Sequence, residues 1–494
     1  MTIKFTINQL FDANVLKTDM NNVKELQHKI AVAYQSKNMN LVKQLQQELI
    51  NSESAIRQAV CRIVRSNGAY TPGIDKFIIN SPAKFNEAVN YLRSVAIKPM
   101  TYKSQPVRRV EIPKPGTDKM RPIGIPTIFD RCVQQLFLFT LAPIAEVGAD
   151  SDSYGFRINR GTQDAVYAAQ QKLHNNYPRM IYDADISKFF DSVSHEWILK
   201  NIPIHPHVLS QFIGAGFLHN NVLYETAMGF PQGGIISPTI SNMVLDGLNG
   251  TVLNAIKGVN AARTVHFVRY ADDFIITGPD YAQYAWLWDQ RIIPAVATFL
   301  KSRGLKLSKE KSKLVTRQEG FDFLGWNLRW IDNVLKPGKF MWLIQPSQKS
   351  ITRIKDRLTE FFASRKQATV QDVVVGVNQI LRGWGNYYKH GHSSAAFHNI
   401  DYVITTLCNN WAKNKFTKVG ARKIHRKHFR IVKGYDTLVY IDNNGKVIPV
   451  VRLGKEIPLT RYEGKSFVNP YLIKDSAALK PKSTLSIWDD LDGI

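Results

Sequence analysis

The stretch FVRYADDFIIT, residues 267–277, places two adjacent aspartates, Asp272 and Asp273, between two apolar runs. Apolar and aromatic residues on either side of a short polar step predict two strands of a tight hairpin, with Ala271, Asp272 and Asp273 at or beside its tip. Turn chemistry alone would explain one aspartate. Two neighbouring carboxylates in an apolar setting repel each other and lose water, so we expect a divalent cation to neutralise them.

A metal site needs further ligands, and the stretch MIYDADISKFFD, residues 180–191, offers them. Its apolar run predicts a strand, and Asp183 and Asp185 fall on one face because side chains alternate with a period of two. Either carboxylate could join the hairpin pair. One carboxylate from a strand end and two from a neighbouring hairpin can hold two Mg²⁺ ions about 3.5–4 Å apart, the arrangement that polymerases use. Each acidic motif is weak evidence for a metal site by itself, and the two together are stronger evidence.

The net charge of the chain indicates which kind of molecule it binds. Lys and Arg number 65 against 40 Asp and Glu, a net charge of +25, which indicates a polyanion and favours nucleic acid. We find no run of about 18 apolar residues and no N-terminal signal, so a soluble protein is expected. Cys61, Cys132 and Cys408 lie far apart, which argues against disulfides or a zinc site and fits a reducing compartment.

The length predicts three or four structural units, and the residue pattern changes along the chain accordingly. The expected order is helical runs at 21–50 and 53–65, an α+β unit at 85–330, a helical module after Pro346 with Ser347 as N-cap, and β-type runs at 436–442 and 446–453 around a turn at 443–445. The tail beyond Ser476 is expected to be loosely ordered.

Three motifs in one order resemble the A, B and C motifs of reverse transcriptases: MIYDADISKFFD, GFPQGGIISP at 229–238, and YADD at 270–273. Further matches are VEIPKPGTDKMRPIGIP at 110–126 for the fingers, GLKLSKEKSK at 304–313 for motif D, and FDFLGW at 321–326 for the primer grip. The resemblance implies an α+β right-hand polymerase, with fingers and an antiparallel palm sheet followed by an α-helical thumb and preceded by a helical N-terminal extension.

The resemblance assigns roles to individual positions. It implies that Asp185, Asp272 and Asp273 are catalytic and bind the metal, with Ile186 also in the metal set, and that the cofactor is two Mg²⁺ ions. The residues implied to bind the incoming dNTP are Lys114, Arg121, Phe190 and Gln232. Phe190 matches the steric gate that excludes a 2′-OH, although an ordinary core Phe is the alternative. Lys311 is a candidate to protonate pyrophosphate, but Lys309 and Lys313 crowd that alignment.

A second resemblance concerns the helical region after Pro346. LRGWGNYYKHG, residues 381–391, resembles the maturase domain, or domain X, of group II intron-encoded proteins, with a helix of core aromatics as the alternative. Residues 411–430 hold eight Lys or Arg and no acid, a composition suited to phosphate contacts, although charge runs are usually solvated faces. The residues expected to bind RNA are Arg382, Trp384, Tyr387, Lys413, Lys415, Arg422, Lys423, Arg426 and Lys427.

The two ends of the chain also compare with this family. The N-terminal helices and SNGAYTPGIDK, residues 66–76, look like its N-terminal extension, with Lys76 in place of the usual final Gly. Phe189 also departs from the small residue common before the gate. RYEGKSFVNPY, residues 461–471, is similar to the segment that precedes an HNH endonuclease, but no paired cysteines follow. We therefore expect no DNA-nicking activity.

These observations predict a group II intron-encoded reverse transcriptase and maturase of bacterial type without the endonuclease. The expected domains are a helical RNA-binding extension at 1–84, fingers and palm at 85–340, thumb or domain X at 341–430, and a DNA-binding-like remnant at 431–494. Its partners would be group II intron RNA or another RNA template, a DNA primer or target, and dNTPs, with no membrane. A cytoplasmic, nucleoid-associated protein is expected, with an organellar origin open.

Two alternative functions remain open from the sequence. A domesticated reverse transcriptase, serving in defence, repair or a CRISPR system, would keep the polymerase residues without assisting splicing or retromobility. A noncatalytic RNA-binding splicing factor would tolerate loss of the aspartates, and the intact Asp185, Asp272 and Asp273 speak against it.

Overall fold

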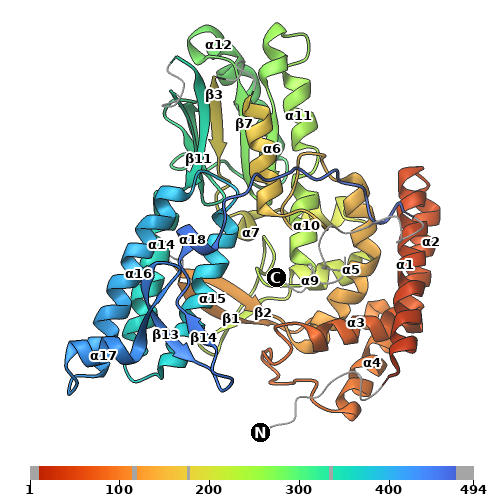
Figure 1. Cartoon of the computed structure of the whole chain (residues 1–494). Coiled ribbons are helices and arrows are strands. Elements are labelled where there is room, and N and C mark those ends of the chain that lie inside the picture. The colour runs from red at the N-terminus through yellow and green to blue at the C-terminus, as the bar shows by residue number, and fades with distance from the viewer. Residues whose placement is uncertain (1–10, 114–119, 175–178, 333–337, 474–494) are drawn as a thin grey trace.

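The computed structural model describes residues 11–113, 120–174, 179–332 and 338–473, with helices at both ends of the fold and antiparallel strands between them (Figure 1). The described residues form four sheets, of which the sheets at 107–224 and at 180–316 have four strands each. This arrangement confirms the predicted α+β class. Lys114 and the tail beyond Ser476 lie outside the described residues.

The N-terminal unit is a group of helices packed around one apolar helix. Its elements are α1 (Ala13–Gln35), α2 (Met39–Asn51), α3 (Glu53–Arg65), α4 (Pro82–Ile97) and the central α5 (Ile128–Gly148). The run predicted as one helix at 21–50 is two helices, because Lys37 adopts a left-handed φ of 59° and the Asn38 side chain caps α2. The run predicted at 53–65 matches α3.

The helix α5 is the one described helix that is long and apolar enough to cross a membrane. Its most apolar window is 83% buried inside the protein, where Cys132, Leu136 and Leu141 contact the surrounding helices. A buried core helix passes the same test of length and composition, so this helix is weak evidence for a membrane span.

The sheet that carries the acidic motifs lies between two clusters of buried apolar side chains. Its antiparallel strands are, in spatial order, β6 (Phe267–Tyr270), β7 (Asp273–Gly278), β3 (Met180–Ala184) and β8 (Lys313–Thr316). Tyr182 and Phe274 pack toward the N-terminal helices, whereas Ile181 and Ile275 pack toward the C-terminal helices. Since alternate side chains point to opposite faces, both faces of this sheet are buried and its strands are strongly apolar.

The described residues up to Pro346 also form further helices and two more sheets. The helices are α6 (Thr162–His174), α7 (Phe189–Ser192), α8 (His195–Asn201), α9 (Pro206–Ile213), α10 (Ser237–Leu245), α11 (Leu248–Ala255), α12 (Tyr281–Leu287) and α13 (Ile293–Lys301). The second sheet has the order β2 (Met120–Ile125), β1 (Val107–Pro113), β4 (Phe217–His219) and β5 (Val222–Tyr224). A third sheet follows, with β9 (Phe321–Phe323), β10 (Trp326–Asp332) and β11 (Phe340–Pro346).

The C-terminal part begins with the predicted helical module. It contains α14 (Gln348–Ala363), α15 (Val370–Tyr388), α16 (Ser394–Lys415) and α17 (Ala421–His428), followed by β12 (Phe429–Val432), β13 (Tyr435–Ile441), β14 (Val447–Pro449) and α18 (Leu453–Glu456). Ser347 caps α14 as predicted, since its hydroxyl accepts from the Ser350 N–H. The strand predicted at 436–442 is β13, but only three residues of 446–453 form a strand.

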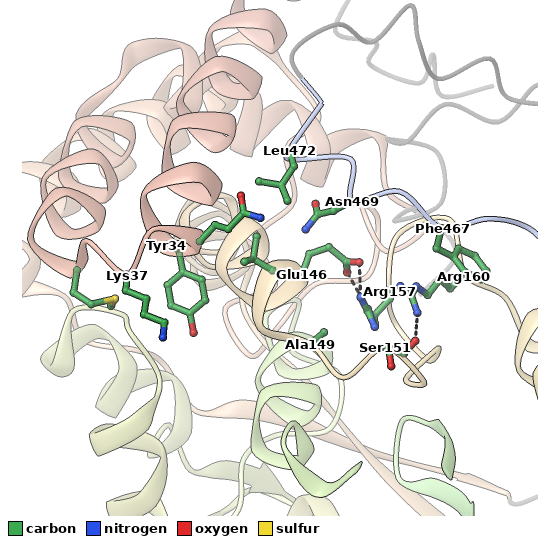
Figure 2. A pocket seen from close by; sticks show the side chains of 13 residues that line it. Tyr34, Lys37, Glu146, Ala149, Ser151, Arg157, Arg160, Phe467, Asn469 and Leu472 are labelled. Carbon is green, nitrogen blue, oxygen red and sulfur yellow. Dashed lines mark hydrogen bonds and ion pairs between the residues drawn. The ribbon is translucent and has the colours of Figure 1, made fainter. Parts of the chain in front are cut away.

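Residues 458–473, which we call the C-terminal strap, run without helix or strand from α18 across α6 to the N-terminal helices (Figure 1). The Tyr462 hydroxyl donates to Asp164, and the Tyr471 carbonyl pairs with the ring of His28. Figure 2 shows Asn469 and Leu472 near Glu146 of the N-terminal unit, and Phe467 beside Arg160, around a cavity of about 720 Å³. The strap therefore connects the C-terminal part of the structure to the N-terminal helices.

Candidate active site

The predicted hairpin is present at residues 267–278, and its turn has two residues. Tyr270 lies opposite Asp273 in the β6–β7 pair, so Ala271 and Asp272 form the turn. Ala271 has a φ of 55°, in the left-handed region that favours glycine. Asp272 therefore lies at the tip of the hairpin, and Asp273 is the first residue of β7.

The end of β3 brings a third carboxylate to this tip. β3 pairs directly with β7, with Ala184 opposite Phe274. Asp185 follows at the end of the strand, and Asp183 lies one pair further into the sheet, opposite Ile275. The structure thus brings together the strand end and the hairpin, as predicted from the two motifs.

The carboxylates influence one another electrostatically. Loss of water on burial raises the pKa of Asp272, and the charge of Asp185 raises it further, while Arg121 and Lys311 lower it. The pKa of Asp273 is also raised, by loss of water and then by Asp272, Asp185 and Asp183, although its side chain is partly open to solvent. Burial raises the pKa of Asp183 to about 6. Excess negative charge of this kind favours the binding of a cation.

One of the three carboxylates forms an ion pair with a lysine. Lys311 Nζ donates to both carboxylate oxygens of Asp185, at 3.1 Å each. The segment before Lys311 lies along the chain after β3, where the Ser308 N–H donates to the Asp185 carbonyl at 2.8 Å and Ile186 forms a bridge with Leu307. Lys311 therefore lies at the site, as its predicted role requires.

The donor groups fit a divalent cation in kind. Carboxylates are the usual ligands of Mg²⁺, and Ile186 can offer only its main-chain oxygen. Within the described ranges, no group of three His, Cys, Asp or Glu side chains is close enough to hold a metal ion. The predicted ligands thus share one end of the sheet without forming a closed cage.

The predicted gate residue lies beside the glycine-rich loop. Phe190 packs edge-on against Phe230, with ring centroids 5.4 Å apart. The Phe230 N–H donates to the Phe190 carbonyl at 2.9 Å, and a Cβ at Gly229 would lie only 2.2 Å from that carbonyl oxygen. Phe190 and Gln232 line one cavity of about 290 Å³, so the structure brings these two predicted dNTP-binding residues together.

Arg121 is the fingers residue whose position can be described. It lies on β2 with an exposed side chain, and its positive charge partly offsets the rise in the pKa of Asp272 that burial and Asp185 cause. Arg121 is therefore near enough to the hairpin for its charge to act on Asp272. Lys114, the other predicted clamp residue, lies outside the described residues.

The aromatic residues of α15 face the protein interior. Trp384 packs against Tyr388 and Phe397, and Tyr387 stacks on Trp326 while its hydroxyl donates to the Leu324 carbonyl at 2.7 Å. These contacts favour the alternative interpretation, core aromatics, over direct RNA binding. Arg382 on the same helix is exposed.

The basic segment at 411–430 presents most of its charge to solvent. One residue of α17, Ile424, is buried, and the exposed basic residues of the prediction are Lys413, Arg422, Lys423, Arg426 and Lys427. Lys415 differs, because its Nζ donates to the Gln367 carbonyl and lies near the rings of Trp411 and Phe416. This lysine has a packing role whether or not it touches RNA.

Arg269 is a buried residue of the site that the sequence analysis missed. It lies on β6, two residues before the turn, with its guanidinium bound to Asp246. The available signal was a charged residue inside the apolar run FVRYADDFIIT. Its partner could not be predicted, since Asp246 belongs to a different element.

Three family models match successive segments of the chain. Residues 112–328 match the model described as reverse transcriptase (RNA-dependent DNA polymerase), and residues 16–92 match the N-terminal domain of reverse transcriptase. Residues 351–429 match the maturase-specific domain of group II introns. These matches confirm both predicted resemblances and the right-hand polymerase fold class.

Similar proteins include relatives from bacteria and from Schizosaccharomyces pombe. The chain is 29% identical to protein YkfC of Escherichia coli over 343 residues, 62% of this chain and 88% of that protein. It is 25% identical to the group II intron-encoded protein LtrA of Lactococcus lactis over 398 residues, 63% of this chain and 65% of LtrA. A 91 kDa protein in the cob intron of Schizosaccharomyces pombe is 23% identical, with 47% of its length matched.

Proposed function

We infer the activity from one premise: this chain belongs to the reverse transcriptases that carry the maturase-specific domain of group II introns. We propose that it is an RNA-directed DNA polymerase that extends a DNA primer on an RNA template with dNTPs. The observation that carries the proposal is the meeting of Asp185, at the end of β3, with Asp272 and Asp273 at the hairpin tip.

Asp185, Asp272 and Asp273, with the main-chain oxygen of Ile186, would hold two Mg²⁺ ions. When bound, these ions activate the primer 3′-OH and stabilise the leaving pyrophosphate. Loss of water on burial and then repulsion from neighbouring carboxylates raise the pKa of Asp272 and Asp273, and a bound cation would relieve that repulsion.

The side chains around the carboxylates would bind and select the nucleotide. Arg121, and Lys114 by resemblance, would bind the triphosphate, since guanidinium and ammonium groups pair well with phosphate oxygens. The ring of Phe190 would exclude a 2′-OH, and Gln232 would line the same cavity under the templating pair. Lys311 would protonate pyrophosphate after releasing Asp185.

We also propose that the chain binds its intron RNA and assists splicing and retromobility. The support is the maturase-specific match at 351–429 together with the exposed basic residues of α17. Phosphate contacts from these side chains would hold the RNA without any carboxylate chemistry. The domains predicted from the sequence, including the DNA-binding-like part at 431–494, belong to the same proposal.

Primer extension tests the polymerase. Purified wild type is compared with Asp272→Ala and with Asp332→Ala, a control that removes an exposed aspartate at the end of β10. We expect cDNA from wild type and the control but not from Asp272→Ala, and addition of EDTA to stop the reaction. Extension by Asp272→Ala at the wild-type rate would contradict the assignment of the hairpin aspartates.

RNA binding tests the maturase. We expect Lys423→Ala/Arg426→Ala to weaken binding to a group II intron RNA and to lower the slope of log K against log salt by about 1.4, roughly 0.7 for each lost phosphate contact. Lys301→Ala, at the exposed end of α13, is the control. Efficient primer extension by a wild type that neither binds nor splices intron RNA would favour a domesticated reverse transcriptase.

A further inference from the structure

Arg269 carries a charge in the middle of the protein. Its side chain has no exposed surface, although it lies on β6 only three residues before Asp272. A guanidinium buried in this way is costly unless its donors find partners. The identity of those partners therefore indicates what the residue is for.

The guanidinium contacts two side chains and the catalytic turn. Nη2 donates to Asp246 at 2.5 Å, which neutralises the charge. Nη1 donates to the Asn242 side chain at 3.2 Å and, more weakly, to the carbonyl of Ala271 at 3.4 Å. That carbonyl belongs to the peptide group that joins Ala271 to Asp272, so Arg269 contacts the peptide that orients Asp272.

The main chain around Gly155 also packs against this turn. A Cβ at Gly155 would lie 2.4 Å from the Ala271 nitrogen, so the main-chain segments at Gly155 and Ala271 are in direct contact. The Gly155 carbonyl accepts from the Asn242 side chain at 2.7 Å, and the Arg269 carbonyl accepts from the Tyr154 N–H at 2.8 Å. The Asn242 side chain thus hydrogen-bonds both to the Arg269 side chain and to the main chain of Gly155, which contact the same turn.

The acidic partner comes from the helix that follows the glycine-rich loop. α10 begins at Ser237, directly after the loop at 229–236, and Asp246 is its C-cap. The ion pair therefore connects this helix to the turn that carries Asp272.

We propose that Arg269 is a positioning residue, which with Asp246 and Asn242 holds the Ala271–Asp272 peptide so that Asp272 can share a divalent cation with Asp185. This inference rests on the proposed polymerase function for its kinetic consequence, but not for its consequence for metal binding. We expect replacement of the pair to displace Asp272 while Phe190 and Gln232, which lie on other segments, keep their positions.

The test replaces the pair as a unit, because removing Arg269 alone would leave Asp246 buried and uncompensated. Arg269→Met/Asp246→Leu is compared with wild type, with Arg269→Lys, and with Arg57→Met/Asp19→Leu, which replaces a partly buried pair in the N-terminal helices. Thermal unfolding checks the fold. The measurements are kcat per active site from burst kinetics, KM for dNTP, and Mn²⁺ affinity by electron paramagnetic resonance, with Asp272→Ala as the reference for a lost ligand.

We expect the folded Arg269→Met/Asp246→Leu variant to lose about 100-fold in kcat with little change in KM for dNTP. Its Mn²⁺ affinity should fall by about 10-fold, as for loss of a group that orients a metal ligand. Arg269→Lys, which keeps the charge without the planar fork, should lie between this variant and wild type, and the N-terminal control should retain wild-type values.

Wild-type kcat and Mn²⁺ affinity in the folded double variant would overturn the positioning role, as would equal losses in the N-terminal control. A wild type that makes no cDNA, together with weakened Mn²⁺ binding in the double variant, would support the positioning role and refute the polymerase. A wild type that neither extends primers nor binds Mn²⁺ would overturn both.

Discussion

Replacing Gly229 with alanine tests how the glycine-rich loop is held against Phe190. Gly229 has a φ of 75°, and a Cβ there would lie 2.2 Å from the Phe190 carbonyl oxygen. The Gly229 N–H donates to the Val193 carbonyl at 2.8 Å, so the loop cannot move away without straining a hydrogen bond. The matched control is Gly258→Ala, where φ is 80° and nothing lies within 4 Å of the added Cβ.

The magnitudes of the two changes follow from these contacts. A left-handed φ costs alanine about 1–2 kcal/mol at either position. At Gly229 the overlap adds about 1–3 kcal/mol, and a strained backbone hydrogen bond adds about 1 kcal/mol. We therefore expect Gly229→Ala to cost about 2–4 kcal/mol more than the control. At roughly 2–4 °C per kcal/mol for a domain of 150–250 residues, the unfolding midpoint should fall by about 5–15 °C more.

The assay combines thermal unfolding with dNTP kinetics. Because Gly229→Ala displaces the Phe190 backbone, the KM for dNTP should rise in this variant, whereas Gly258→Ala should leave it unchanged. Equal midpoint shifts in the two variants would refute the reasoning, since the contact with Phe190 would then contribute nothing beyond the common strain in φ.

Further predictions concern the packing and the caps. Tyr387→Phe removes the hydrogen bond to Leu324 and should cost about 1 kcal/mol of stability without changing RNA affinity, whereas reduced RNA affinity in gel-shift titration would restore Tyr387 as an RNA contact. Tyr471→Ala removes a ring that lines a cavity with Phe139 and Glu146 of α5 and should lower the thermal unfolding midpoint, while Tyr402→Ala, 75% exposed, should not; equal shifts would exclude an anchor role for the ring. A hydrogen bond from the Thr369 side chain lowers the pKa of Asp372 below its ordinary 3.8, so the stability from this cap is present above that pH and lost as pH falls through the lowered value. The stability difference between wild type and Thr369→Ala should accordingly shrink between pH 6 and pH 3, and a constant difference would argue against the cap.

The elements that could be predicted from the sequence depend on neighbours along the chain. The hairpin at 267–278 follows from two apolar runs on either side of a short polar step. The start of α14 follows from Ser347, which caps it three residues away, and the helix at 53–65 follows from its own periodicity. In each case the deciding hydrogen bonds or side-chain pattern lie within a few residues, so the local sequence contains the information.

The same locality explains why the acidic site was predictable in part. The order of the motifs placed Asp185, Asp272 and Asp273 together, and the pairing of β3 with β7 confirms that placement. The pairing of Lys311 with Asp185 was not predictable, because these residues are 126 positions apart and three lysines stand close together in the motif.

By itself, the sequence determined the class of the protein, its acidic hairpin and its basic C-terminal segment, because composition and short-range pattern decide these features. Only the tertiary structure decided that Trp384 and Tyr387 face the core, that Arg269 contacts the turn that carries Asp272, and that the strap returns to the N-terminal helices. The physical reason is that such contacts join residues far apart in the chain, as Tyr471 and His28 are by 443 positions. Their pairing depends on how all the intervening elements pack.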